Sequence, residues 1–245
     1  MIIDAHSHLG KCRIYGNEVT EENLINTMDK NEVRSAIVQP FPGVSDATAV
    51  HNQIAELTQK HPGRIFGMVS LNPYININTY RAETLRCIRE LGFVAIKLHP
   101  AAHAVSPLSD TAMMVFELAN ELDIPIMVHT GAGTPFALPA LCIPAARQYP
   151  NLRIILAHAG FAIYTPEAYV VAKECENVFL ETSWCLGEDI AWLVNSIGAE
   201  RVMIGSDLPS NLPVEITKYR TLDLENDQLK QCLYYTAKYV FKLKI

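Results

Sequence analysis

The sequence Met1-Ile2-Ile3-Asp4-Ala5-His6-Ser7-His8 opens the chain with a short apolar run that leads into two histidines. Residues two apart on a β-strand project to the same face, so His6 and His8 are expected to present two imidazoles side by side at a strand end. Neutral imidazole is the commonest protein ligand for metal ions. The segment therefore predicts a first strand over residues 2–5 that delivers a pair of candidate metal ligands.

Apolar strand-like runs and helix-like runs alternate along the rest of the chain, a pattern typical of consecutive βα units. The predicted strands cover residues 2–5, 35–39, 65–71, 93–98, 124–128, 153–157, 178–182 and 202–205. The predicted helices cover residues 21–31, 47–60, 80–91, 111–122, 138–148, 166–176, 188–197 and 225–243.

Eight strand–helix pairs in 245 residues, with no linker of unusual composition, predict an α/β fold: a single (β/α)8 TIM barrel domain over residues 1–245. Functional groups of such a barrel lie at the C-terminal ends of its strands. The rival fold, an open doubly wound sheet, usually has fewer strands and a Gly-rich phosphate turn after the first strand, which this sequence lacks. The last predicted helix, 225–243, is expected to pack against the barrel wall.

The composition is that of a globular protein, with 49% hydrophobic and 19% charged residues and a formal net charge of −6. This charge offers no basic footprint for nucleic acid. The six cysteines form no Cys-x-x-Cys pair, which favours a reduced, cytoplasmic compartment over a disulfide framework or zinc finger. No run reaches about 18 apolar residues, and the first strand leaves no room for a signal peptide. We expect a small-molecule substrate and no nucleic-acid or membrane partner. The sequence leaves open whether the protein forms a homo-oligomer.

Ionisable side chains follow five of the predicted strands at the same level of the barrel. His6 and His8 follow the first strand. The later ones are Lys97 and His99 on the fourth strand, His129 after the fifth, His158 after the sixth and Asp207 after the eighth. Because the C-terminal ends of the strands meet around one mouth, these groups are predicted to form one cluster.

Several imidazoles and one carboxylate make a ligand set for a divalent metal ion, with zinc the first expectation and manganese an alternative. Such an ion would lower the pKa of a bound water molecule from about 15.7 towards about 7 and polarise a substrate carbonyl. The cluster therefore predicts metal-assisted hydrolysis.

Each assignment also has a structural reading. The histidines could be hydrogen-bonded structural residues, Asp207 could cap the turn that follows it, and Lys97 could form a buried ion pair. Trp184 follows the seventh strand, where it could form an apolar pocket wall or anchor a loop. His51 and His103, on a helix and in a loop, are expected to have surface roles.

The whole set resembles the amidohydrolase superfamily, and more narrowly its amidohydrolase-related (amidohydrolase 2) family of TIM-barrel metal-dependent hydrolases. The resemblance rests on Ile-Ile-Asp-Ala-His-Ser-His at the start and on the later segments Ile-Lys-Leu-His-Pro, Ala-His-Ala-Gly and Gly-Ser-Asp-Leu-Pro. It extends from residue 2 through the eighth strand. This motif set is specific for the superfamily but says little about the substrate.

The resemblance implies one of two metal sites. In the mononuclear branch, one ion is bound by His6, His8, His129 and Asp207. His158 and Asp207 would then be catalytic, and a cationic Lys97 would hold a substrate carboxylate or phosphate. From their positions after strands, His99 and Trp184 are further candidates for substrate binding. In the binuclear branch, a carboxylated Lys97 bridges two ions, with His6, His8 and Asp207 on one and His129 and His158 on the other. The Ile-Lys-Leu-His-Pro context favours the mononuclear branch.

The resemblance implies a hydrolase that acts through metal-activated water on a small, carboxylated amide, ester or lactone. A metal-dependent decarboxylase on the same scaffold is the alternative, because the mononuclear branch includes decarboxylases of aminocarboxymuconate semialdehyde and resorcylate type. A TatD-like deoxyribonuclease is disfavoured, since that family usually supplies Glu where this chain has Lys97. A non-catalytic metal-binding barrel would share the ligand set but lack turnover.

Overall fold

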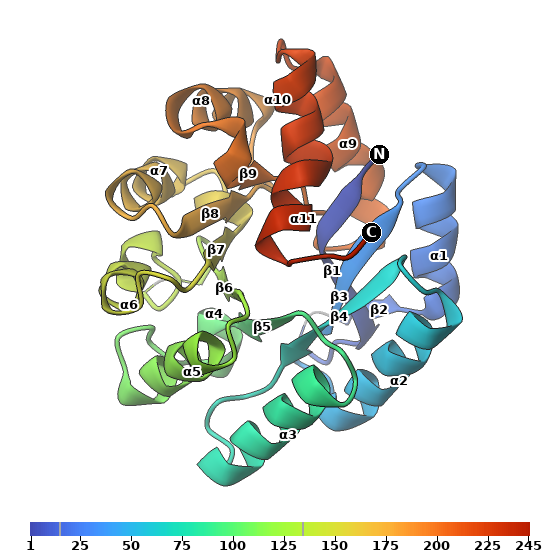
Figure 1. The fold of residues 1–245 in the computed structure, drawn as a ribbon, viewed down its shortest axis with the longest axis vertical. Helices are drawn as coiled ribbons and strands as arrows, with labels where there is room; N and C mark the ends of the chain where they lie inside the picture. The colour runs from blue at the N-terminus through green and yellow to red at the C-terminus, as the bar shows by residue number, and fades with distance from the viewer. Residues whose placement is uncertain (15, 134) are drawn as a thin grey trace.

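The structure, a computed structural model, describes residues 1–14, 16–133 and 135–245 and shows a ring of helices around a central sheet (Figure 1). Eight strands run parallel in the order of the chain. They are β1 (Ile3–Lys11), β3 (Ser35–Pro40), β4 (Ile65–Ser70), β5 (Ala95–Leu98), β6 (Ile126–His129), β7 (Ile154–Ala157), β8 (Val178–Glu181) and β9 (Val202–Met203). A ninth strand, β2 (Glu18–Val19), pairs antiparallel with the end of β1.

Hydrogen bonds between β1 and the segment that follows β9 close the sheet into a barrel. The Ala5 N–H donates to the Ile204 carbonyl at 3.1 Å, and the Asp207 N–H donates to the His6 carbonyl at 2.7 Å. The buried Asp4 carboxylate adds two bonds, since it accepts from the Ser206 N–H at 2.8 Å and from the Ser206 hydroxyl at 2.6 Å. The predicted (β/α)8 TIM barrel is confirmed.

Helices cover the outside of the barrel (Figure 1). They are α1 (Glu21–Lys30), α2 (Ala47–Lys60), α3 (Ile77–Arg89), α4 (Pro100–His103), α5 (Asp110–Glu121), α6 (Ile143–Gln148), α7 (Thr165–Glu174), α8 (Gly187–Ile197), α9 (Leu212–Thr221), α10 (Asn226–Lys230) and α11 (Thr236–Val240). Short 3-10 segments are η1 (Pro139–Cys142), η2 (His158–Gly160), η3 (Ala199–Arg201) and η4 (Pro209–Asn211), and η5 (Gln231–Tyr235) is a π-helix. Thr20 and Ser109 cap α1 and α5 through side-chain oxygens, as helix start signals do. Within the described ranges, no helix has the length and apolarity that crossing a membrane requires.

The hydrophobic core has two parts. One lies between the strands and the surrounding helices. The other fills the barrel interior with side chains that include Ile3, Ile37, Met68, Met127 and Met203. On the strands that carry site residues, these interior residues come before them: Ile3 precedes His6, Met127 precedes His129, and Met203 precedes Asp207. The apolar filling therefore leaves the C-terminal half of the barrel to the polar residues.

The C-terminal helical region does more than cover the barrel wall, which corrects the prediction. Leu233 belongs to the core between strands and helices, whereas Val240, Phe241 and Leu243 belong to the interior core. The region divides into α10, η5 and α11, and a π-helical segment adds a residue to the turn and so rotates the apolar face. The carbonyl of Cys232, within η5, accepts the N–H of Ile204 at 3.2 Å.

Helix α9 was missed from the sequence. Its buried apolar residues Leu212, Ile216 and Tyr219 have helical spacing, and Pro213 stands in the first turn, where proline is favoured. The buried Glu215 lies among them and interrupts the apolar stripe. These residues carried a helix signal, and the polar residue obscured it.

Most other predicted boundaries lie within three residues of the observed ones. The exceptions are β1, which continues to Lys11, and the predicted helix 138–148, whose first part is the 3-10 segment η1 and whose α-helix begins at Ile143. The surface roles expected for His51 and His103 are wrong. His51 is fully buried, where it bonds the Glu83 carboxylate at 2.9 Å and accepts the Ser70 N–H at 3.1 Å. His103 is buried at the end of α4. Both histidines lie on the inner faces of their helices.

Truncation of Phe241 tests the interior core. Because this side chain is only 2% exposed, we expect Phe241→Ala to lower the free energy of unfolding by about 3 kcal/mol. Urea unfolding followed by circular dichroism measures the loss. Tyr239→Ala is the control, since Tyr239 is 65% exposed and should change stability by about 0.5 kcal/mol or less. Equal losses of unfolding free energy in the two variants would contradict the placement of Phe241 in the interior core.

Candidate metal centre

A cavity of about 340 Å³ opens at the C-terminal ends of the strands. Seven of the eight predicted site residues line it: His8, Lys97, His99, His129, His158, Trp184 and Asp207. The eighth, His6, is fully buried beside them. The volume suits a small organic molecule. Residues spread over more than 200 positions of sequence are thus brought to one mouth of the barrel, as the sequence predicts.

His6, His8 and Asp207 form a group of possible metal ligands at this mouth of the barrel. Asp207 Oδ1 lies 3.4 Å from His6 Nε2 and 3.2 Å from His8 Nε2. One ligand atom from each of the three residues lies within 4.8 Å of the others. Two imidazole nitrogens and one carboxylate oxygen are ligands that zinc and manganese accept.

The hydrogen bonds of the two imidazoles direct their lone pairs towards this centre. His6 Nδ1 lies 2.8 Å from Glu181 Oε2, and since a carboxylate only accepts, Nδ1 carries the proton. His8 Nδ1 likewise faces the Pro40 carbonyl at 3.3 Å. Nε2 of each ring is left with a lone pair, and burial lowers the pKa of His6 well below its usual value. The donor set therefore fits a divalent cation.

Lys97 lies against this group. Its Nζ is 3.0 Å from His6 Nε2, and the residue is only 1% exposed. Burial lowers the pKa of Lys97 to about 8, although the negative charges of Asp207 and Glu181 act in the opposite direction. The side chain is therefore a cation at neutral pH that releases its proton more readily than an exposed lysine.

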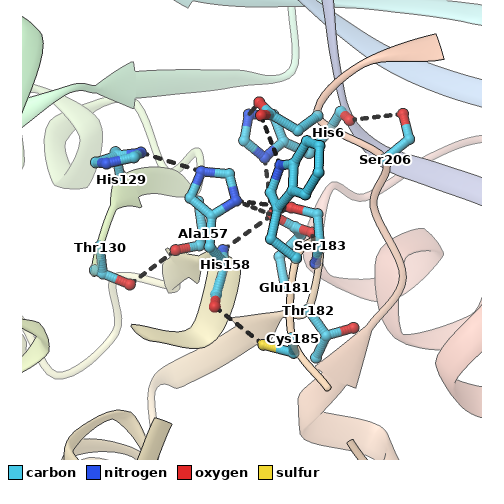
Figure 2. Close-up of polar contacts among 12 residues, drawn as sticks. His6, His129, Thr130, Ala157, His158, Glu181, Thr182, Ser183, Cys185 and Ser206 are labelled. Carbon is cyan, nitrogen blue, oxygen red and sulfur yellow. Dashed lines mark hydrogen bonds and ion pairs between the residues drawn. The ribbon is translucent and has the colours of Figure 1, made fainter. Parts of the chain in front are cut away.

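His129 and His158 form a second pair beside the first group (Figure 2). His158 Nε2 lies 3.1 Å from His129 Nδ1, while His129 Nε2 donates to the Ala132 carbonyl at 2.7 Å. His129 thus does not share the group of ligand atoms formed by His6, His8 and Asp207. Burial lowers the pKa of His129 to about 4, so the ring is neutral near pH 7.

Glu181 at the end of β8 is a site residue that the sequence reasoning missed. It is fully buried and accepts from His6 Nδ1 at 2.8 Å, from the His158 N–H at 3.2 Å, and from the N–H and hydroxyl of Ser183 at 2.6 and 3.1 Å (Figure 2). A Cβ at Gly205 would come within 2.5 Å of Glu181 Oε1, so the glycine leaves space for this carboxylate. The signal was present, because Glu181 directly follows the apolar Val178-Phe179-Leu180 of a predicted strand.

Three site residues have left-handed backbone conformations that are unusual outside glycine. The φ angles are 65° at His158, 67° at Trp184 and 64° at Asp207. Each residue follows the last residue of a strand or lies a few positions beyond it. Such conformations cost about 1 kcal/mol or more and persist where the surroundings enforce them, often at functional sites. The strained turns aim these side chains into the cavity.

His99 and Trp184 complete the cavity wall. His99 Nδ1 accepts the Ala102 N–H at 3.2 Å, so its proton is on Nε2, and its ring stacks on His129 with centroids 4.0 Å apart. Burial and the neighbouring His129 lower the pKa of His99 well below its usual value, which keeps the ring neutral. Trp184 Nε1 donates to Asp207 Oδ2 at 2.9 Å. Each residue therefore combines a flat surface with a fixed polar contact.

The family model described as amidohydrolase matches residues 3–243. The chain belongs to the amidohydrolase family. A relative from Sphingobium sp. (strain NBRC 103272 / SYK-6), 2-keto-4-carboxy-3-hexenedioate hydratase, is 28% identical over 246 residues, which is 78% of this chain and 72% of the relative. The resemblance predicted from the sequence is confirmed, and with it an enzyme of this metal-dependent superfamily.

Solved structures show the same fold. The 5-carboxyvanillate decarboxylase of Novosphingobium aromaticivorans, complexed with manganese and 4-hydroxy-3-methoxy-5-nitrobenzoic acid, has a TM-score of 0.78 at 20% identity, over 99% of this chain and 96% of that one. The 4-oxalomesaconate hydratase of Rhodopseudomonas palustris has a TM-score of 0.70 at 18% identity, over 99% and 96% of the two chains. The family and the donor set together support a divalent metal site.

Replacing the Glu181 carboxylate tests whether this residue orients the candidate metal ligands. Four donors point at Glu181, and the amide of Glu181→Gln would turn an NH2 group towards some of them. We expect metal affinity to fall about 10- to 100-fold, as for other groups that orient metal-binding histidines. Competition with a chelator measures this affinity. Glu83→Gln is the matched control, because Glu83 bonds His51 in the same manner outside the cavity. An unchanged affinity in Glu181→Gln would contradict the assignment.

The buried amine of Lys97 predicts a pH dependence of stability. Between pH 8 and about 10.5 the unfolded chain retains a proton that the folded chain has released, so the metal-free protein gains stability as pH rises. The gain over this window is about 3 kcal/mol, and Lys97→Met should remove it. Urea unfolding of both proteins at pH 7.5 and 10 measures the difference. Lys60→Met, at an exposed lysine, should leave the pH dependence unchanged, and a similar pH dependence in wild type and Lys97→Met would overturn the prediction.

Proposed function

We propose that the protein binds one divalent ion through His6, His8 and Asp207, with His129 and His158 beside it, and uses it to add water to a small carboxylated substrate. The observation that carries the proposal is the convergence of two oriented imidazole lone pairs and one carboxylate oxygen on a cavity of about 340 Å³. When bound, the ion would lower the pKa of a coordinated water molecule from about 15.7 towards about 7 and polarise a substrate carbonyl. Zinc remains our first choice and manganese the second.

The roles of the side chains follow from their contacts. Asp207 Oδ1 faces the ligand group and is placed to accept a proton and pass it on. Burial would raise the pKa of Asp207, but the neighbouring rings of His8, His158 and His6 hold it well below its usual value. His158 lines the cavity and is oriented by two contacts: its Nδ1 lies 2.8 Å from Ser183 Oγ, and its Nε2 lies 3.1 Å from His129 Nδ1. It would orient the attacking water or stabilise an oxyanion.

Lys97 and His99 would recognise the substrate. Both residues line the cavity, where Lys97 supplies a buried cation and His99 a neutral Nε2–H donor. A carboxylate accepts from both kinds of donor. Phe41 and Trp184 add apolar surface to the wall. A cationic Lys97 would attract a substrate carboxylate, whereas a carboxylated lysine would be an anion and would repel it, so this role goes with the mononuclear site.

Water addition includes two reactions. Hydrolysis of an amide, ester or lactone is what the sequence predicts, and hydration of 2-keto-4-carboxy-3-hexenedioate is the reaction named for the Sphingobium relative. Both need an activated water molecule and a proton acceptor, which Asp207 supplies. The 28% identical relative favours an unsaturated, carboxylated keto acid as the first substrate class to assay.

Decarboxylation is the second candidate. The cavity wall includes the aromatic rings of Phe41, Phe161 and Trp184, which suit a flat substrate. The decarboxylase from Novosphingobium aromaticivorans shares the fold. In this reaction Asp207 or His158 would deliver a proton to the carbon that loses its carboxylate.

A substrate panel tests the function. The metal-free protein, reloaded with zinc or manganese, is assayed on unsaturated keto dicarboxylates by loss of their conjugated absorbance, on amides, esters and lactones by acid release, and on aromatic carboxylates by release of carbon dioxide. We expect turnover of the first or second group that chelation abolishes. Activity that survives complete metal removal, or no turnover with either ion, would sink the proposal.

Asp207→Asn tests the proton-transfer role. The amide keeps the size of the side chain but accepts a proton poorly, so we expect kcat to fall about 100- to 10,000-fold on whichever substrate the panel identifies. Asp189→Asn, at a partly exposed acid of α8, is the control and should retain activity. A passive metal-binding barrel would show no turnover in the wild type and only a loss of affinity in Asp207→Asn.

A further inference from the structure

The two oxygens of Asp207 have different partners. Oδ1 faces His8 Nε2 at 3.2 Å and His6 Nε2 at 3.4 Å, on the side of the ligand group. Oδ2 accepts the indole N–H of Trp184 at 2.9 Å. An indole nitrogen can only donate, so this contact has one possible direction. One oxygen is directed at the metal position, and the other is occupied by a neutral donor.

We propose that Trp184 is a positioning residue for the metal centre, whose indole N–H fixes Asp207 as a ligand through one oxygen. The inference rests on the proposed metal site. Without the indole N–H, the carboxylate could rotate about its terminal torsion, which has a broad energy profile. Oδ2 would then compete with Oδ1 for the ion and for the histidines.

The position of Trp184 is itself fixed by α9. The backbone N–H of Trp184 donates to Glu215 Oε1 at 2.9 Å. The backbone carbonyl of the next residue, Cys185, accepts from Lys218 Nζ at 2.8 Å. Glu215 is 1% exposed and is held by Asn211 Nδ2 at 2.8 Å and by Lys218. Backbone groups of two consecutive residues of the turn are thus bonded to side chains of one helix.

These ties explain a costly backbone conformation. Trp184 has a φ of 67°, which a tryptophan adopts only when its surroundings enforce it. The bond to Glu215 uses the backbone N–H of that same residue. The conformation places the indole against Phe161, with ring centroids 6.1 Å apart, and its N–H against Asp207. A simple wall residue would need the ring but not this N–H contact.

The experiment separates the N–H from the ring. Trp184→Phe keeps an aromatic side chain and removes the donor. Trp192→Phe is the matched control, since Trp192 lies on α8, is 39% exposed and packs against Tyr169 at a tilt, away from the cavity. We expect zinc to bind Trp184→Phe about tenfold or more weakly than it binds the control, by chelator competition. We also expect kcat to fall more than KM rises, because the ligand and not the substrate wall is disturbed.

A spectroscopic measurement on the unaltered protein provides a second readout. The chain has two tryptophans, so a nitrogen-15 NMR spectrum contains two indole N–H signals, assigned by their loss in the two Phe variants. We expect zinc to shift the Trp184 signal, and Asp207→Ala to remove its protection from solvent exchange. Equal zinc affinity in the two Phe variants, with a Trp184 signal that neither zinc nor Asp207→Ala changes, would overturn the inference alone. A wild-type protein that binds no zinc or manganese would overturn the proposed function together with it.

Discussion

The buried carboxylate of Glu181 is the contact on which the architecture of the site depends. A buried charge is stable only when donors surround it, and Glu181 has four, contributed by β1, by the turn after β7 and by the turn after β8. In satisfying this one charge the fold sets the tautomer of His6 and locates the backbone of His158. The chemistry of the cavity thus follows from a residue that does not line it.

Inside the barrel, the apolar side chains that stabilise the fold are separate from the polar side chains that form the site. The N-terminal half is filled by aliphatic and methionine side chains and closed by Val240, Phe241 and Leu243. The C-terminal half holds buried histidines, carboxylates and Lys97, which are costly to desolvate. The apolar packing of the barrel interior can offset that cost. Asp4, at the closure between β1 and the segment after β9, is only 1% exposed, and burial raises its pKa to about 7.

Helix α9 has a role that its place on the outside of the barrel would not suggest. Its inward face carries Glu215, and this carboxylate accepts the backbone N–H of Trp184 and so fixes the turn after β8. The same polar residue is what hid the helix from periodicity, because a stripe with an acid in it does not match an amphipathic pattern. The acid that breaks the amphipathic pattern of α9 is thus the residue that supports the site, and such departures from local sequence rules are expected at functional sites.

The sequence by itself determined the order of strands and helices, the barrel, the family and the convergence of His6, His8, His129, His158 and Asp207, because side-chain period and strand order follow from local geometry. Only the tertiary structure decided which of their ligand atoms lie close enough together to bind one metal ion. The tautomers depend on partners such as Glu181 and Pro40, the aim of Asp207 depends on a left-handed turn and on Trp184, and the inward face of His51 depends on α3. These are long-range contacts between strand ends and helices, and no periodicity within a single segment encodes them.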